Sequence, residues 1–294
     1  MTTRSQRLGG LAAVALLALT AACSPKEADS DSTSEPSGQG ATTLADCKPD
    51  NLELFAAGKL TVATDDPAYD PWFSDNTPSN GKGFESAVAY AVADRLGFAK
   101  TDVTWVKAGF NQVIQPGKKN FDFDINQFSI SAKRAKAVDF STPYYDVSQA
   151  IITLKSSKYA NAKTLADLKG AKLGAQIATT SLTAIDAIEP TTKPLVYDDT
   201  SKAGQALANK QVDAIVADLP TAYYLTAAEI DNSKIVGEFS PPGDKPESFG
   251  LLLAKNSPLT TCVSVAVDSI SKDGTLAKLQ QKWLNQATAV PELP

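Results

Sequence analysis

Residues 121–145 read FDFDINQFSISAKRAKAVDFSTPYY, and this stretch decides the fold class. Apolar and polar side chains alternate at the start of residues 122–128, which predicts a β-strand. Residues 132–137 follow and predict a helical stretch. A strand that leads directly into a helix is typical of α/β proteins, in which the two kinds of element succeed each other along the chain.

The same alternation extends on both sides of this stretch. Residues 84–96 carry apolar side chains at positions 84, 88, 91, 92 and 96, which is the spacing of one helical face. Further strands are predicted at residues 59–64, 103–106, 172–176, 196–197 and 213–217. Further helices are predicted to begin near Thr180, Ser201 and Leu219 and to span residues 259–271 and 276–284, and Thr164 and Asp167 have capping-box spacing. The pattern therefore predicts an α/β fold with mostly parallel sheets.

The composition is that of a globular protein. The chain has 294 residues, of which 43% are hydrophobic and 21% are charged, so it can form one large domain or two modest ones. A disordered chain, a fibrous repeat and a multispan membrane protein are excluded. The net charge is −5, and no run of Lys and Arg is longer than two residues. We therefore expect no binding to nucleic acid.

The chain contains no histidine. This removes the Ser–His–Asp triad, the Cys–His dyad and every histidine-ligated metal site. The sequence also has no glycine-rich phosphate fingerprint and no G-x-S-x-G motif. We expect neither a metal nor a cofactor, and an enzyme would have to use carboxylates, hydroxyls, lysine or arginine.

The N-terminus has the pattern of an export signal. Two arginines precede an apolar run at residues 8–19, which is too short to span a bilayer because a spanning helix needs roughly 20 residues. Small residues and Cys23 follow, which resembles the lipobox of bacterial lipoproteins. Residues 1–22 would then be removed and Cys23 acylated. Thr20 departs from the leucine that this family prefers, and an ordinary secretory signal is the alternative.

Residues 23–43 are predicted to be a flexible tether, because they are rich in Ser, Thr, Gly and acidic residues and lack large apolar side chains. The folded body would thus be anchored by lipid on the extracytoplasmic face of the cell membrane. In that oxidising compartment, Cys47 and Cys262 are predicted to form a disulfide between the start of the body and a C-terminal helix. Two buried free thiols are the alternative.

Six blocks of sequence, taken in order, resemble the polar amino-acid branch of family 3 of the solute-binding proteins of ABC importers. The blocks are LTVATDDPAYDPW (60–72), GFESAVAYAVADRL (83–96), the opening stretch (121–145), LKGAKLGAQIATTS (168–181), VDAIVAD (212–218) and DGTLAKLQQKW (273–283). Together the resemblance covers residues 50–286.

The resemblance implies a type II periplasmic-binding-protein-like fold, in which two α/β lobes are joined by two crossover strands. Lobe 1 would comprise residues 47–145 and 250–286, and lobe 2 residues 149–244. The lobes of this family close on a ligand like a hinged clamp.

The family's ligand, a free amino acid, is a zwitterion, so its pocket must replace the water around a carboxylate and an ammonium. Arg134 matches the family's carboxylate-binding arginine, and a planar guanidinium fits a carboxylate bidentately. Asp218 matches the ammonium-binding aspartate at the end of a strand. It could also act as the N-cap of the next helix.

The resemblance assigns further ligand contacts in both lobes. In lobe 2 they fall on the hydroxyl residues Thr179, Thr180 and Ser181, at a helix N-terminus that suits an anion. A simple Ser/Thr cap is the alternative there, and Ala178 replaces the family's usual glycine. In lobe 1, Gln127 and Ser129 match positions that contact the ammonium and the carboxylate.

The aromatic residues Tyr69 and Phe110 match the pair that sandwiches the ligand. Asp65 or Asp66 matches the aspartate that binds the ligand's side chain, and the spacing allows either. A carboxylate there favours an amide or cationic side chain and repels an acidic one. The glutamine, histidine and arginine class is therefore preferred over glutamate.

The sequence thus predicts capture of an amino acid followed by closure and docking on a membrane permease, by a monomer that is not an enzyme. Two alternatives remain open. Exported cyclohexadienyl dehydratases, which act on prephenate or arogenate, resemble this family. An amino-acid-sensing lipoprotein is the other alternative.

Overall fold

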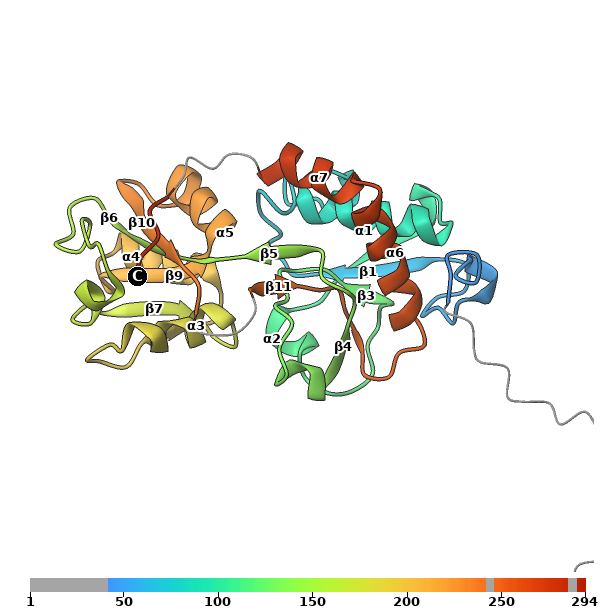
Figure 1. Ribbon diagram of the computed structural model, residues 1–294, viewed down its shortest axis with the longest axis horizontal. Coiled ribbons are helices and arrows are strands. Elements are labelled where there is room, and N and C mark those ends of the chain that lie inside the picture. The colour runs from blue at the N-terminus through green and yellow to red at the C-terminus, as the bar shows by residue number, and fades with distance from the viewer. Residues whose placement is uncertain (1–41, 242–245, 285–289) are drawn as a thin grey trace, which may run out of the picture. The chain divides into compact units, whose positions relative to one another are not determined.

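A computed structural model describes residues 42–241, 246–284 and 290–294 of the chain (Figure 1). The predicted signal peptide, Cys23 and the tether up to residue 41 lie outside the described residues. Within the described part, no helix has both the length and the apolar character needed to cross a membrane.

The first sheet belongs to lobe 1 and has the strand order β2-β1-β3-β12-β4. Its strands are β1 (Leu60–Thr64), β2 (Val103–Lys107), β3 (Phe123–Asp124), β4 (Val138–Phe140) and β12 (Leu252–Ala254). Helices α1 (Phe84–Leu96), α6 (Thr260–Lys272) and α7 (Thr275–Leu284) pack on one face and the short α2 (Phe110–Val113) on the other (Figure 1). Both faces of the sheet are therefore covered, which explains why β1 is buried along its whole length.

The second sheet belongs to lobe 2 and has the order β10-β6-β9-β7-β8. Its strands are β6 (Gln149–Leu154), β7 (Leu173–Gln176), β8 (Leu195–Tyr197), β9 (Ala214–Asp218) and β10 (Ser233–Phe239). Successive residues of β6 alternate between two cores, since Ile151 packs into one and Ile152 into the other. The helices are α3 (Thr180–Ala184), with the first core, and α4 (Thr200–Ala208) and α5 (Leu219–Tyr224), with the second.

Strands β5 (Tyr145–Val147) and β11 (Glu247–Phe249) pair with each other between the two sheets. They are the two crossover strands, and the predicted two-lobed α/β fold is confirmed. Every strand of the first sheet lies in the residues predicted for lobe 1, and every strand of the second in those predicted for lobe 2. The boundary residues themselves stay a prediction, and residues 242–244, 285 and 286 of those ranges lie outside the described part.

Short helical segments complete the described elements. They are Pro49–Asn51, Pro78–Asn80, Lys100–Asp102, Arg134–Lys136, Leu165–Leu168 and Ile185–Ile188, which are 3-10 helices, and Leu225–Glu229, a π-helix. Thr164 and Asp167 form the predicted capping box at the start of one of them.

The sequence prediction differs from the structure in three details. The predicted strand at 122–128 is regular only at Phe123–Asp124, because Gln127 turns to φ 48° where its backbone N–H donates to the buried Glu85. The helix predicted at 132–137 is a single 3-10 turn. The sheets are mixed rather than mostly parallel, because β6 and β12 run antiparallel to both of their neighbours.

Two long-range links hold the termini of the described chain. The predicted disulfide is present, with the Cα atoms of Cys47 and Cys262 5.4 Å apart, and it ties the segment before β1 to α6. At the other end, residues 290–294 lie against lobe 2, where Leu293 is buried and the Glu238 N–H donates to the Pro291 carbonyl at 2.9 Å. No sequence pattern predicted this second contact.

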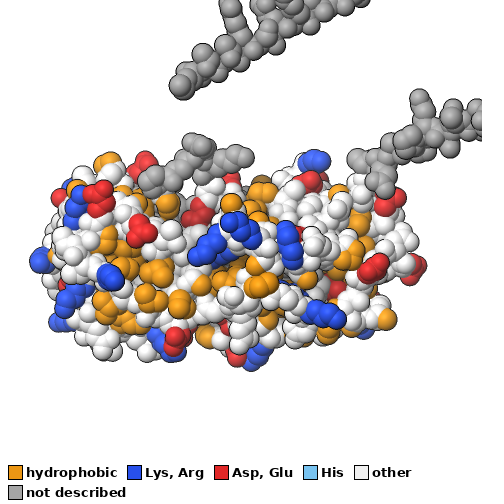
Figure 2. Space-filling view, turned by 90° about the horizontal axis from the view of Figure 1, so that it is seen from below, with side chains coloured by type: hydrophobic (Ala, Val, Ile, Leu, Met, Phe, Trp, Pro, Cys, Tyr) orange, Lys and Arg blue, Asp and Glu red, His pale blue; other side chains and the backbone are white. Residues whose placement is uncertain are grey.

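On the face seen in Figure 2, the Lys and Arg side chains are interspersed with acidic and hydrophobic ones.

Candidate functional site

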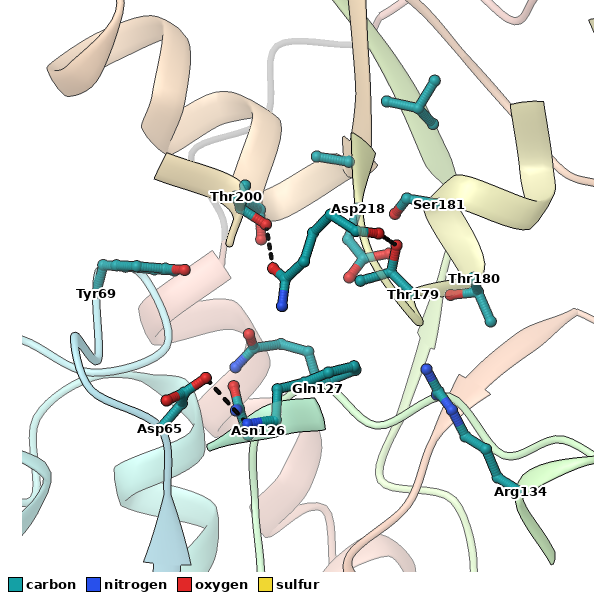
Figure 3. Close-up of a pocket in the computed structure, with 15 residues that line it drawn as sticks. Asp65, Tyr69, Asn126, Gln127, Arg134, Thr179, Thr180, Ser181, Thr200 and Asp218 are labelled. Atoms are coloured by element: carbon teal, nitrogen blue, oxygen red, sulfur yellow. Dashed lines mark hydrogen bonds between the residues drawn. The ribbon is translucent and has the colours of Figure 1, made fainter. Parts of the chain in front are cut away.

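A pocket lies between the two lobes, at the carboxyl ends of β1, β7 and β9 (Figure 3). This edge is where open α/β sheets place their ligands. Lobe 1 contributes Asp65, Tyr69, Phe110, Asn126, Gln127 and Arg134. Lobe 2 contributes Gln176, Thr179, Thr180, Ser181, Thr200, Val216, Ala217, Asp218 and Thr221. The space not filled by protein, counted together with the open solvent at its mouth, is about 590 Å³.

All but two of the predicted ligand-contacting residues line this pocket, and the exceptions are Asp66 and Ser129. The Asp66 carboxylate accepts a hydrogen bond from Lys107 Nζ at 2.6 Å, and this interaction lowers its pKa. Asp65, in contrast, lines the pocket. Of the two aspartates that the spacing allowed, the structure therefore brings Asp65 to the site.

Ser129 lies directly behind the pocket and is buried. Its hydroxyl is 3.1 Å from the Thr180 hydroxyl of lobe 2 and donates to Glu247 Oε1 at 2.5 Å. Ser129 therefore connects lobe 1 with lobe 2 and with crossover strand β11.

Arg134 is fixed in a set orientation at one end of the pocket. One of its amino groups donates to the Ser129 carbonyl at 2.8 Å and the other to the Ala178 carbonyl of lobe 2 at 2.9 Å. The guanidinium lies over the Phe110 ring, 5.3 Å from its centroid. Burial lowers the pKa of Arg134, while Asp218 and Glu247 raise it, and a guanidinium stays protonated in proteins.

The lobe 2 turn that faces Arg134 begins with Ala178, whose φ is 63°. This left-handed conformation favours glycine, but Ala178 adopts it here. Thr179 is the N-cap of α3, since its hydroxyl accepts from the Leu182 N–H at 3.1 Å and donates to the Gln176 carbonyl at 2.7 Å. The Thr179 side chain therefore does act as a helix cap, while Thr180 and Ser181 follow in the first turn.

Asp218 ends β9 and precedes α5, but its side chain makes no capping hydrogen bond. Its Oδ1 accepts from Gln149 Nε2 at 2.7 Å, and the same nitrogen donates to Glu247 Oε2 at 2.8 Å. One amide thus holds two carboxylates close together. Burial raises the pKa of Asp218, and the negative charge of Glu247 raises it further.

The aromatic residues pack with neighbours from the two lobes. Tyr69 stacks on Tyr224 of α5, with ring centroids 6.1 Å apart, and burial raises the pKa of its hydroxyl. Phe110 stacks on Phe128 at 4.8 Å, and its N–H donates to Asp65 Oδ2 at 3.1 Å.

Six polar residues at or behind the pocket were not predicted as ligand contacts from the sequence, namely Asn126, Gln149, Gln176, Thr200, Thr221 and Glu247. Gln149 and Glu247 sit on strands at the crossover, and Thr200 donates to Gln176 Oε1 at 2.7 Å. The position of Gln176 at the end of a predicted strand was a usable signal, because strand ends collect ligand-binding residues.

Glu85 is a further unpredicted residue and is fully buried at the start of α1. It accepts hydrogen bonds from the backbone and side-chain amides of Gln127 and from the Tyr144 hydroxyl. Burial raises the pKa of Glu85 to about 7. Its acidic side chain inside an apolar helix start is the sequence signal that could have revealed it.

Among the residues that the structure describes, no group of three or more His, Cys, Asp or Glu side chains is arranged to hold a metal ion. The pocket chemistry is that of hydrogen bonds, one guanidinium and carboxylates.

Known proteins resemble this chain in sequence and in fold. The family profile "Bacterial extracellular solute-binding proteins, family 3" matches residues 60–286. The L-cystine-binding protein TcyJ of Escherichia coli (strain K12) is 31% identical over 222 residues, covering 73% of this chain and 79% of TcyJ. The ABC transporter glutamine-binding protein GlnH of Bacillus subtilis (strain 168) is 28% identical over 296 residues, covering 97% of this chain and 99% of GlnH.

A solved structure of an ancestral arginine-binding protein bound to glutamine is 32% identical, with a TM-score of 0.65, and the match covers 79% of this chain and 100% of that one. The family match spans most of the chain and includes both lobes and the pocket between them. The protein belongs to the bacterial extracellular solute-binding proteins, family 3.

Proposed function

We propose that this protein captures a polar or basic L-amino acid outside the cytoplasm and delivers it to the permease of an ABC importer. The observation that carries the proposal is the pair Arg134 and Asp218, a guanidinium and a carboxylate that line one pocket from different lobes. A free amino acid presents the complementary pair of charges. The relatives named above bind cystine, glutamine and arginine, and this supports an amino acid as ligand.

In the proposed complex the α-carboxylate binds the guanidinium of Arg134 and the hydroxyl and N–H groups of Thr180 and Ser181. The α-ammonium binds Asp218, next to the backbone of Gln127. The rings of Tyr69 and Phe110 cover the ligand from the lobe 1 side. These roles follow from charge and from the residues that share the pocket.

Binding and closure are coupled in this proposal. The ligand contacts both lobes at once, so it binds a closed arrangement better than an open one and shifts the population toward it. The closed form is then the one that docks on the permease. We further propose that acylated Cys23 anchors the protein as a monomer on the outer face of the membrane.

No bond is made or broken in this function, and the protein is proposed not to be an enzyme. A thermal-shift panel tests this with the twenty amino acids, ornithine, citrulline and cystine, and with prephenate and arogenate as controls. A ligand at 100 times its Kd should stabilise the folded protein by about 2.7 kcal/mol. A response to amino acids supports capture, whereas turnover of prephenate or arogenate, or silence across the amino acids, contradicts it.

A further inference from the structure

The wall of the pocket away from Arg134 carries a pair of side chains that hydrogen-bond each other. Gln176 ends β7, and Thr200 begins α4, the next helix after β8. The two strands are in register, with Gln176 opposite Tyr197, and Asp199 fixes the start of α4 by accepting from the Lys202 N–H at 2.7 Å. The Thr200 hydroxyl is therefore held beside Gln176 and donates to its Oε1 at 2.7 Å (Figure 3).

This bond sets the direction of the Gln176 amide. Because Oε1 faces Thr200, the Nε2 amino group points to the other side of the amide. Among the described residues, Gln176 Nε2 has no hydrogen-bond partner, and it is not one of the fully buried polar atoms that lack one. Gln176 itself lines the pocket. A hydrogen-bond donor is thus available to a ligand at this position.

Asp65 provides the opposite chemistry from lobe 1 (Figure 3). Its Oδ1 accepts from the Asp66 N–H at 2.8 Å and its Oδ2 from the Phe110 N–H at 3.1 Å. These two backbone donors fix the carboxylate, and each oxygen keeps a lone pair for a further donor. Asp65 and Thr200 line the same pocket from the two lobes.

We propose that Gln176 and Asp65 select the ligand's side chain by offering it one donor and one acceptor, so that the preferred ligand ends in a carboxamide, as glutamine does. This rests on the function proposed above. A carboxamide accepts from Gln176 Nε2 through its oxygen and donates to Asp65 through its amino group. A guanidinium has only donors and places one against Gln176 Nε2, and a carboxylate is repelled by Asp65.

Isothermal titration calorimetry with L-glutamine, L-arginine and L-glutamate tests the inference. The wild-type protein should bind glutamine about tenfold or more tightly than either of the others, because each rival leaves a polar group mispaired. Gln176→Glu replaces the donor by an acceptor and should weaken glutamine binding about tenfold while strengthening arginine binding. Gln205→Glu, on the exposed face of α4, makes the same charge change outside the pocket and should leave all three affinities unchanged.

Thr200→Val provides a second test that does not introduce a charge. Without the hydroxyl the Gln176 amide can rotate, so the preference for glutamine over arginine should fall several-fold. Tighter binding of arginine or glutamate than of glutamine by the wild type overturns the inference, as does an unchanged preference in both variants. If none of the three amino acids binds and the full panel is silent, the proposed function itself fails, and the two failures are thus distinguishable.

Discussion

Ligand affinity should depend on pH through Asp218. Burial and the nearby Glu247 carboxylate raise the pKa of Asp218, so in the free protein this group keeps its proton at a pH where an ordinary aspartate has lost it. A bound ammonium favours the ionised carboxylate. Binding must therefore expel the proton, and affinity falls as the pH drops below the raised pKa.

The size of this pH effect on affinity follows from the release of one proton from Asp218 when the ligand binds. Between the pKa of Asp218 in the complex and its raised pKa in the free protein, the association constant should rise by up to about tenfold per pH unit, since one pKa unit is about 1.4 kcal/mol. The window lies above 3.8, the ordinary value for an aspartate. Arg134 contributes no slope, because its guanidinium stays protonated throughout.

Calorimetry with L-glutamine between pH 5 and pH 7.5, in two buffers of different ionisation enthalpy, measures the released proton directly. Asp218→Asn should bind weakly and without this pH dependence, and Asp231→Asn, on an exposed residue, should behave as the wild type. Glu247→Gln removes the neighbouring charge, so the rise should move to lower pH. Equal heats in both buffers and a flat wild-type affinity would refute the reasoning.

Three other variants test separate parts of the structure. Arg134→Lys keeps the charge but loses the two-pronged guanidinium, and calorimetry should show an affinity loss of about tenfold or more. Replacing Cys47 and Cys262 together by serine opens a loop of 215 residues, which should lower the free energy of unfolding by about 5 kcal/mol. In calorimetric melts Tm should fall by about 10 °C or more, with little change in ligand affinity. An unchanged Tm would contradict this. Asp124 is fully buried, and its carboxyl oxygens have no partner among the described residues. Burial raises its pKa, so the folded protein loses stability as the pH rises and this carboxyl group has to ionise, whereas at low pH the protonated group carries no such penalty. Asp124→Asn should therefore raise the free energy of unfolding at pH 7 but not near pH 3, as denaturant titrations at both pH values can check.

Local periodicity was sufficient to predict most elements of the fold. The helix Phe84–Leu96 matches its prediction at both ends, because the apolar spacing and the glycines on either side are local features. The residue at which β3 ends cannot be predicted from the local sequence. It depends on the contact between Gln127 and Glu85, which are 42 positions apart, and on no pattern within the strand. The return of Leu293 to lobe 2 likewise depends on space beside Gly237, where a Cβ would lie 2.6 Å from the leucine side chain.

The candidate site likewise contains residues that could be predicted from the sequence and residues that could not. Residues at the ends of strands, such as Asp218, could be placed from the strand pattern and the family resemblance. The choice between Asp65 and Asp66 could not, because it is made by Lys107, which lies on the neighbouring strand and bonds Asp66. Gln149 donates a hydrogen bond to Glu247, which lies 98 positions further along the chain, and no local sequence motif predicts either residue.

Gln149 and Glu247 link the Arg134 and Asp218 sides of the pocket through crossover strand β11. Ser129 holds Arg134 by its carbonyl and donates its hydroxyl to Glu247, at 2.8 and 2.5 Å respectively. Glu247 accepts from Gln149 at 2.8 Å, and Gln149 donates to Asp218 at 2.7 Å. Hydrogen bonds of these lengths break when their atoms move apart by about 1 Å. A rotation of one lobe against the other therefore has to disturb the groups proposed to bind the carboxylate and the ammonium, so closure and recognition depend on the same side chains.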